Sequence, residues 1–383
     1  MDTEERLFSE ASSLGDLLER LRSRISHALV GGASWEALLK RASDLPSTLA
    51  AFPFGFELPL HEQRPHADFG VSLVSGSRSA RHFQSLGNGK DADPVLAELA
   101  RLVREKGRKN SLLNRITGRK MLLEYDIDPS GDGLHPAPGA FLYPTEKPLY
   151  GRDASRRLED LGVVLDGVAA TGWDWDARER RQVERLFLAL QPEARILSLG
   201  AFPCRTRGIR LAVTGFETSG EVMTFLQRAG WPWPPASVES TLAHLEARDG
   251  FGTIAVHLDV RADGLGPKLG LGLYARDMSW LQGGRYWLDA PNNWTAFIDS
   301  MREEQFAVPE KLTALENWSS GAELLFGRAG RFVLVRGVHH VKLVATEDRV
   351  DQVKAYVFLL MCSPEQAGPT PAGTARQQER PGG

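Results

Sequence analysis

The chain has 383 residues, of which 42% are hydrophobic and 25% are charged, and its formal net charge is −3. This balance gives no support for nucleic acid or an anionic membrane as the main partner, because either would favour a basic surface. The sequence contains no run of eighteen apolar residues, so no membrane span is predicted. The start of the chain lacks the basic and apolar regions of a signal peptide. The two cysteines, Cys204 and Cys362, are interpreted as reduced thiols, and we expect a cytoplasmic protein.

Pairs of strand-like segments recur along the chain, separated by helical or turn-rich sequence. An amphipathic helix is expected over residues 4–29 and a second over 34–44. The strand pairs follow near residues 52–75, 120–143, 194–215, 252–275 and 322–360. We therefore expect five helix–strand–strand–helix units in one domain, residues 1–362, whose N-terminal helices occupy residues 1–45. Residues 363–383 are rich in Pro, Gly and Gln, which predicts a disordered tail.

Apolar and polar side chains lie on opposite faces of the predicted strands. In the strand that begins at Lys120, Met121 and Leu123 share one face, and Lys120, Glu124 and Asp126 share the other, because side chains alternate across a strand. The apolar faces need helices to cover them. We predict an α+β fold, a ten-stranded antiparallel barrel with helices outside and a polar lumen. Two stacked ferredoxin-like modules would give a similar pattern.

Basic residues occupy the polar face in four of the strand pairs. Cations that face inward repel one another unless an anion or carboxylates compensate their charge. A diphosphate would do so, because such a leaving group needs charge neutralisation as its bond breaks. On an open sheet the same residues would face solvent. The candidate diphosphate-binding residues are Lys120, Arg210, Lys268, Lys342 and Lys354.

Other polar-face residues are candidates for further chemistry. Glu57 could act as a general base or pair with a lysine. His257 and His340 are expected to face the lumen. Because His339 precedes His340 in a strand, the two rings should point to opposite faces and should not chelate one ion.

Metal binding has weak support in the sequence. Glu124, Asp126 and Asp128 share one strand face and could hold Mg²⁺. We favour the alternative that these carboxylates balance lumen lysines. No motif for a metal site is present, so we predict no metal site and no required cofactor, with Mg²⁺ as an optional one.

The pattern of hairpins resembles the prenyltransferase barrel, the ABBA fold of soluble aromatic prenyltransferases. Over residues 50–361 it is similar to cyanobactin-type peptide prenyltransferases, on the strings Phe56-Glu57-Leu-Pro, Ile209-Arg210-Leu-Ala-Val and Val353-Lys354-Ala-Tyr356. The resemblance implies transfer of a prenyl group from an allylic diphosphate to a peptide side chain or a small aromatic acceptor. It also implies that Glu57 accepts a proton and that Tyr274 and Tyr356 shield the allyl cation.

A second resemblance leaves an alternative open. The segment from Gly337 to Leu343 also looks like part of uncharacterised proteins encoded near ribosomal-peptide natural-product genes. That likeness implies a non-catalytic accessory protein that binds a peptide in the same barrel. The first resemblance has one departure, because the second strand of the first hairpin (Gly70, Ser72, Val74) lacks the basic residue expected there.

Overall fold

A single antiparallel sheet forms the centre of the protein in the computed structural model. The structure describes residues 2–87, 93–128, 137–169, 176–203, 205, 207–248, 251–275, 294–318, 321–347 and 349–367. The strands are β1 (Phe54–Pro59), β2 (Asp68–Val74), β3 (Lys120–Tyr125), β4 (Gly139–Leu142), β5 (Leu149–Tyr150), β6 (Arg195–Ala201), β7 (Ile209–Phe216), β8 (Thr253–Arg261), β9 (Gly264–Tyr274), β10 (Gly321–Gly327), β11 (Gly330–Thr346) and β12 (Arg349–Cys362).

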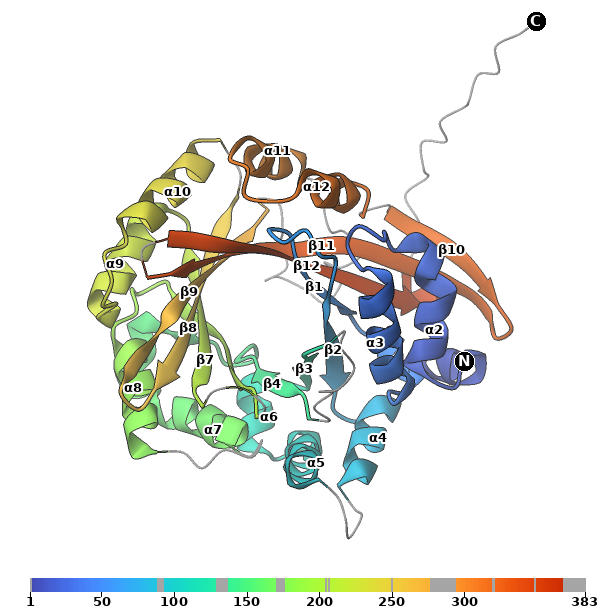
Figure 1. Ribbon diagram of the computed structural model, residues 1–383. Coiled ribbons are helices and arrows are strands. Elements are labelled where there is room, and N and C mark those ends of the chain that lie inside the picture. Colours follow the sequence, from blue (N-terminus) through green and yellow to red (C-terminus); the bar gives the residue numbers. More distant parts are fainter. Residues whose placement is uncertain are drawn as a thin grey trace, which may run out of the picture.

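Ten of these strands close into a barrel (Figure 1). They pair in the order β11-β12-β1-β2-β3-β4-β6-β7-β8-β9, and β9 pairs back onto β11. The length of β11 allows this closure, because its first half pairs with β10 and its second half pairs with β9. β5 and β10 lie outside the ring, on β6 and β11. The predicted ten-stranded antiparallel barrel is confirmed.

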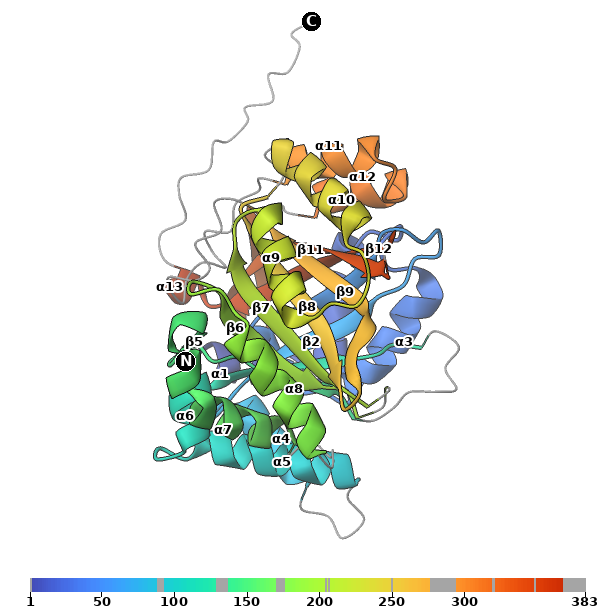
Figure 2. The ribbon, with the colours of Figure 1, turned by 90° about the vertical axis from the view of Figure 1, so that its left-hand side faces the viewer.

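Helices surround the barrel on its outer side (Figures 1 and 2). They are α1 (Thr3–Glu10), α2 (Leu14–Leu21), α3 (Gly32–Ser43), α4 (Arg78–Leu86), α5 (Pro94–Gly107), α6 (Leu112–Thr117), α7 (Leu158–Ala169), α8 (Ala177–Leu188), α9 (Ser219–Ala229), α10 (Ala236–Ala247), α11 (Thr295–Glu303), α12 (Pro309–Glu316) and α13 (Pro364–Ala367). Short 3₁₀ turns cover Arg22–Arg24, Ser47–Ala51 and Gly151–Arg156. Within the described ranges, no helix combines the length and apolar character needed to cross a membrane.

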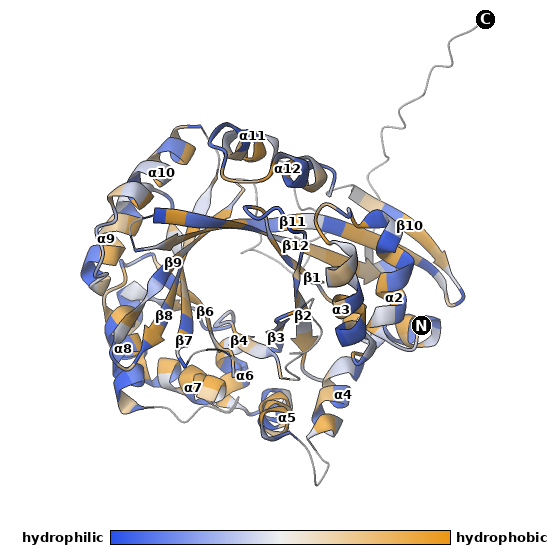
Figure 3. Cartoon of the chain, in the orientation of Figure 1, coloured by the Kyte–Doolittle hydropathy of each residue, from blue (hydrophilic) through white to orange (hydrophobic). Residues whose placement is uncertain are grey.

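The core lies between the helices and the outer face of the sheet. Met121 and Leu123 of β3 are almost fully buried, as are Leu211 and Val213 of β7. Figure 3 shows that the helices carry both hydrophobic and hydrophilic residues, as expected for elements with one buried face. Since the apolar side chains point outward to the helices, the alternating polar side chains are left to face the lumen.

The N-terminal region differs from the single helix predicted over residues 4–29. The helix is interrupted between α1 and α2. There the Ser13 side chain accepts a hydrogen bond from the backbone N–H of Asp16, and the Asp16 carboxylate accepts one from the backbone N–H of Ser13. This capping box starts a new helix. The leucine stripe continues across the break, because Leu7 and Leu14 are both fully buried.

The first residues of the predicted disordered tail, 363–367, are part of the folded structure. Ser363 is buried, and its backbone N–H donates a hydrogen bond to the Thr3 hydroxyl at 2.8 Å. The short helix α13 follows and extends to Ala367. The rest of the predicted tail, residues 368–383, lies outside the described residues, as does Cys204.

Candidate active site

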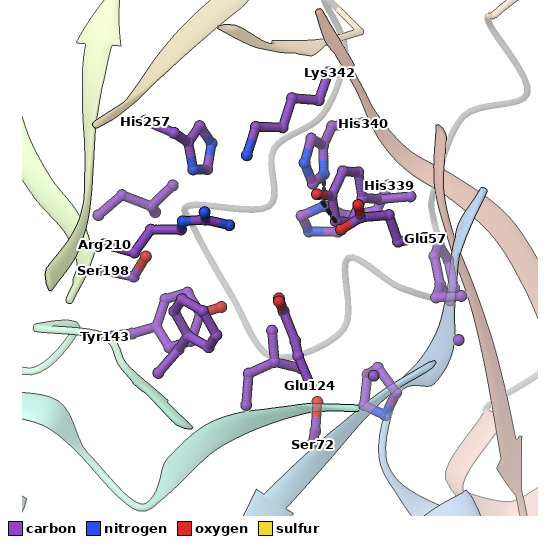
Figure 4. Close-up of a pocket in the computed structure, with 18 of the residues that line it drawn as sticks. Glu57, Ser72, Glu124, Tyr143, Ser198, Arg210, His257, His339, His340 and Lys342 are labelled. Atoms are coloured by element: carbon purple, nitrogen blue, oxygen red, sulfur yellow. Dashed lines mark hydrogen bonds between the residues drawn. The ribbon is translucent and has the colours of Figure 1, made fainter. Parts of the chain in front are cut away.

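A cavity of about 480 Å³ occupies the lumen of the barrel. Each of the ten strands in the ring contributes at least one residue to its wall. Figure 4 shows side chains from several of these strands converging on the space. The residues predicted for the lumen that line it are Glu57, Lys120, Arg210, His257, Tyr274, His340, Lys342 and Tyr356.

Two of the lysines that were predicted to bind diphosphate, Lys354 and Lys268, are not among the residues that line the cavity. Lys354 is adjacent to the cavity wall, where its ammonium donates a hydrogen bond to Glu57 at 2.6 Å. Lys268 is exposed and is not among the lining residues. It pairs with Thr346 at the end of β11, which places it beyond the stretch of β11 that faces the cavity. The structure therefore brings together all the predicted diphosphate-binding residues except Lys268.

Glu57 is held by two donors from β12. Lys354 donates to one carboxylate oxygen, and the Tyr356 hydroxyl donates to the other at 2.5 Å. Burial alone would raise the pKa of Glu57, but the charges of Lys354 and Lys342, together with these hydrogen bonds, outweigh it and lower the pKa to about 2. Glu57 is therefore ionised throughout the neutral range.

Lys342 is a buried cation of the cavity that has no partner among the described residues. Its residue is 7% exposed, and it forms no hydrogen bond or ion pair with any described residue. Burial and the nearby charge of Arg210 lower the pKa of Lys342 to about 7, although Glu57 acts in the opposite direction. An anion bound in the cavity would raise the pKa of Lys342, because it would place a negative charge beside the buried ammonium.

Two arginines of the site, Arg205 and Arg210, already have carboxylate partners. Arg210 of β7 forms a two-bond contact with Asp259 of β8, with the shorter bond at 3.0 Å. Arg205 follows β6, donates to Asp126 at 2.7 Å, and lies over the Phe202 ring at 3.6 Å from its centroid. Such pairs fix the orientation of a guanidinium, whose remaining N–H groups can still donate to a ligand.

Aromatic rings form one wall of the cavity. The His340 ring stacks on Tyr356, with centroids 4.1 Å apart and planes 11° apart, and Tyr274 stacks near His340 at 5.0 Å. His257 lies parallel to His340 at 6.5 Å. Burial and neighbouring charges hold the pKa of His257 and of His340 well below 6.5, so both rings are neutral near pH 7. A neutral π-rich wall of this kind can stabilise a cation.

The two adjacent histidines do not point to opposite faces, as the alternation predicted. Val338 pairs with Val357, but His340 pairs with Tyr356, so His339 is an additional residue in the strand. This bulge interrupts the alternation and turns both rings toward the cavity. Their Nδ1 atoms lie 2.7 Å apart.

The remaining carboxylates differ in their environment. Burial and the negative charge of Glu57 raise the pKa of both Asp68 and Glu124 to about 7. Asp126 balances a cation, but that cation is Arg205 and not one of the lumen lysines that the sequence analysis expected. Across the described part of the chain, no group of three or more His, Cys, Asp or Glu side chains is arranged to hold a metal ion.

Comparisons with known proteins connect this barrel to one fold. No family model matches the chain, and no curated protein matches its sequence. The crystal structure of prenyltransferase PriB in its apo form matches with a TM-score of 0.52 and 15% identity, covering 91% of this chain and 96% of PriB. The fold is the prenyltransferase (ABBA) barrel. PriB in complex with product diphosphate matches with a TM-score of 0.50 and 14% identity, over 91% of this chain and 96% of that chain. The 5-dimethylallyltryptophan synthase from Streptomyces coelicolor has a TM-score of 0.48 and 12% identity, over 94% and 100%.

Sequence reasoning missed several residues that line this prenyltransferase barrel. Tyr143 and Arg195 follow the strand alternation of Phe141 and Leu197, which also face the cavity, so the pattern could have identified them. Arg205 lies in a connection between strands, where no periodicity applies. Nothing in the sequence around Arg205 marks it as part of the lumen.

Proposed function

We propose that this protein transfers a prenyl group from an allylic diphosphate to a peptide side chain or a small aromatic acceptor. The proposal rests on Lys342, which is buried, has no ion-pair partner in the described part of the chain, and faces a cavity with an aromatic wall. A cation without a partner favours an anionic ligand, and the adjacent wall suits the apolar prenyl chain. PriB, whose barrel this chain resembles, has a solved complex with its product diphosphate.

The diphosphate is proposed to bind Lys342 and Arg210, with Lys120 and Lys354 contributing positive charge nearby. The bond between C1 of the prenyl group and the diphosphate oxygen breaks, and the electron pair leaves with the diphosphate. Positive charge on the diphosphate site stabilises that developing negative charge. Tyr274, Tyr356 and the neutral His340 ring surround the allyl cation.

Glu57 is proposed to take the proton that the acceptor loses when its nucleophilic atom bonds to C1. The carboxylate is ionised and faces the cavity, and its hydrogen bonds from Lys354 and Tyr356 fix its position. The acceptor at this stage is a strong acid, so a weakly basic carboxylate suffices. The scheme requires no cofactor, and Mg²⁺ enters it as an optional companion of the diphosphate.

The proposal is tested by measuring whether the protein prenylates an acceptor. Dimethylallyl diphosphate is incubated with the protein and with candidate acceptors, namely tryptophan, tyrosine and short peptides that contain them, with and without Mg²⁺. Mass spectrometry of the acceptor and release of diphosphate are measured together. Prenylated product that disappears in Glu57→Gln and Lys342→Met supports the proposal. Tight peptide binding without turnover for any allylic diphosphate would instead support the non-catalytic peptide-binding alternative.

A further inference from the structure

His257 has a buried ring atom with no partner in the described part of the chain. It lies on β8, where it is paired with Ala212 of β7 and Gly270 of β9. Its Nε2 atom is shielded from solvent and makes no hydrogen bond. Leaving a buried polar atom without a hydrogen bond destabilises the folded protein. Since the ring lines the cavity, a ligand group can satisfy it.

Gly270 shows what lies beside this histidine. A Cβ atom built on Gly270 would be 2.3 Å from Cε and 3.1 Å from Nζ of Lys342, and 3.1 Å from Cβ of His257. The Lys342 side chain therefore crosses β9 over the glycine, through space that any larger residue would occupy. Figure 4 shows His257, Lys342 and Arg210 directed toward the same part of the lumen.

The charges that face His257 come from three strands. Arg210 on β7 is paired with Asp259 on β8, and Lys342 on β11 has no partner among the residues that the structure describes. The neutral His340 ring on β11 lies parallel to the His257 ring. After burial, the charges of Lys342 and Arg210 are what lower the pKa of His257. A bound diphosphate would reverse the sign of this field and favour the imidazolium.

We propose that His257 is a third donor of the diphosphate site, beside Lys342 and Arg210, and that it takes up a proton from solvent when the diphosphate binds. Gly270 provides the space in which Lys342 and His257 meet the same anion. This inference rests on the proposed function, since it refines the diphosphate site of the same lumen. It predicts that diphosphate affinity falls as the pH rises above neutrality.

The test uses inorganic pyrophosphate as the probe and the full-length protein. Isothermal titration near neutral pH, in two buffers of different ionisation enthalpy, gives the affinity and the number of protons taken up. We expect His257→Gln to bind about tenfold or more weakly, as for loss of a charge-assisted hydrogen bond, and to take up fewer protons than the wild type. The matched control is His244→Gln on α10, where the ring pairs with Glu304 outside the barrel. Equal affinity and equal proton uptake in His257→Gln would overturn the inference.

A second measurement needs no variant at the site. In histidine-selective ¹⁵N NMR of the wild type, pyrophosphate should convert one neutral imidazole to imidazolium, and absence of that change would also overturn the inference. The outcomes separate the two proposals. If pyrophosphate binds and Lys342→Met abolishes binding while His257→Gln does not weaken it, the role of His257 alone is refuted. If the wild type binds neither pyrophosphate nor an allylic diphosphate analogue, both proposals fail.

Discussion

Replacing Lys342 with Met should stabilise the protein while it abolishes diphosphate binding. The substitution keeps a long, unbranched side chain above Gly270 but removes the buried charge. Burial and the charge of Arg210 lower the pKa of Lys342 from 10.5 to about 7. One pH unit corresponds to about 1.4 kcal/mol, so a charged Lys342 costs the folded protein on the order of 4–5 kcal/mol at about pH 6.

The stability difference between Lys342→Met and the wild type should depend on pH. Between the folded pKa of about 7 and the ordinary value of 10.5, the unfolded chain binds more protons than the folded one at Lys342. This residue therefore makes wild-type stability rise with pH across that window. The advantage of Lys342→Met should be largest near pH 6 and should shrink to about 2 kcal/mol near pH 9.

Urea unfolding of both proteins at the two pH values measures these differences. Lys40→Met, at an exposed position on α3, is the matched control and should change the free energy of unfolding by less than about 0.5 kcal/mol. A Lys342→Met variant that is less stable than the wild type near pH 6 would show that the charge of Lys342 does not destabilise the folded protein. That result would mean that the ammonium has a partner that compensates its burial.

Four further predictions concern the lumen and its surroundings. Glu57→Gln should reduce turnover by about 10²–10⁴-fold, measured as initial rates; turnover at the wild-type rate would exclude Glu57 as the proton acceptor. The pKa of Glu57 falls from 4.5 to about 2, so its stabilisation is present above pH 4.5 and is lost toward pH 2. Thermal unfolding of Glu57→Gln should therefore lose this acid-dependent part, and an unchanged pH profile would contradict it. Tyr356→Phe, which keeps the ring stacked on His340, should retain more activity than Tyr356→Ala in the same rate assay, and equal rates would argue against cation shielding. Lys268→Ala should bind pyrophosphate with wild-type affinity, because Lys268 is exposed outside the cavity lining; weaker binding by calorimetry would return it to the site.

The barrel could be predicted from the sequence because strand alternation is a local property. In β3, the alternation of apolar Met121 and Leu123 with polar Lys120 and Glu124 is enough to assign an outer and an inner face. The other hairpins show the same alternation. The number of hairpins then fixes the ring of ten strands. Closure itself depends on β11 pairing with both β12 and β9, which no local pattern specifies.

Alternation assigns a face but not a position along the barrel axis. Lys268 and Tyr274 share one face of β9, yet Tyr274 lines the cavity and Lys268 is exposed at the end of the strand pairing. A bulge changes the face itself, and this is why both His339 and His340 reach the lumen. Arg205 was not predicted to line the cavity because it lies in a connection between strands, where side-chain alternation gives no information. The errors at Lys268 and His339 have one origin, since both depend on where strands pair rather than on what each strand contains.

The proposed function requires that the lumen bind an allylic diphosphate. Calorimetric titration with dimethylallyl thiolodiphosphate, a poorly reactive analogue, tests it directly in the wild type and in the double variant Lys342→Ala/Lys354→Ala. We predict micromolar binding that the double variant loses. Absence of binding to the wild type, with and without Mg²⁺, or equal binding to the double variant, would contradict the account.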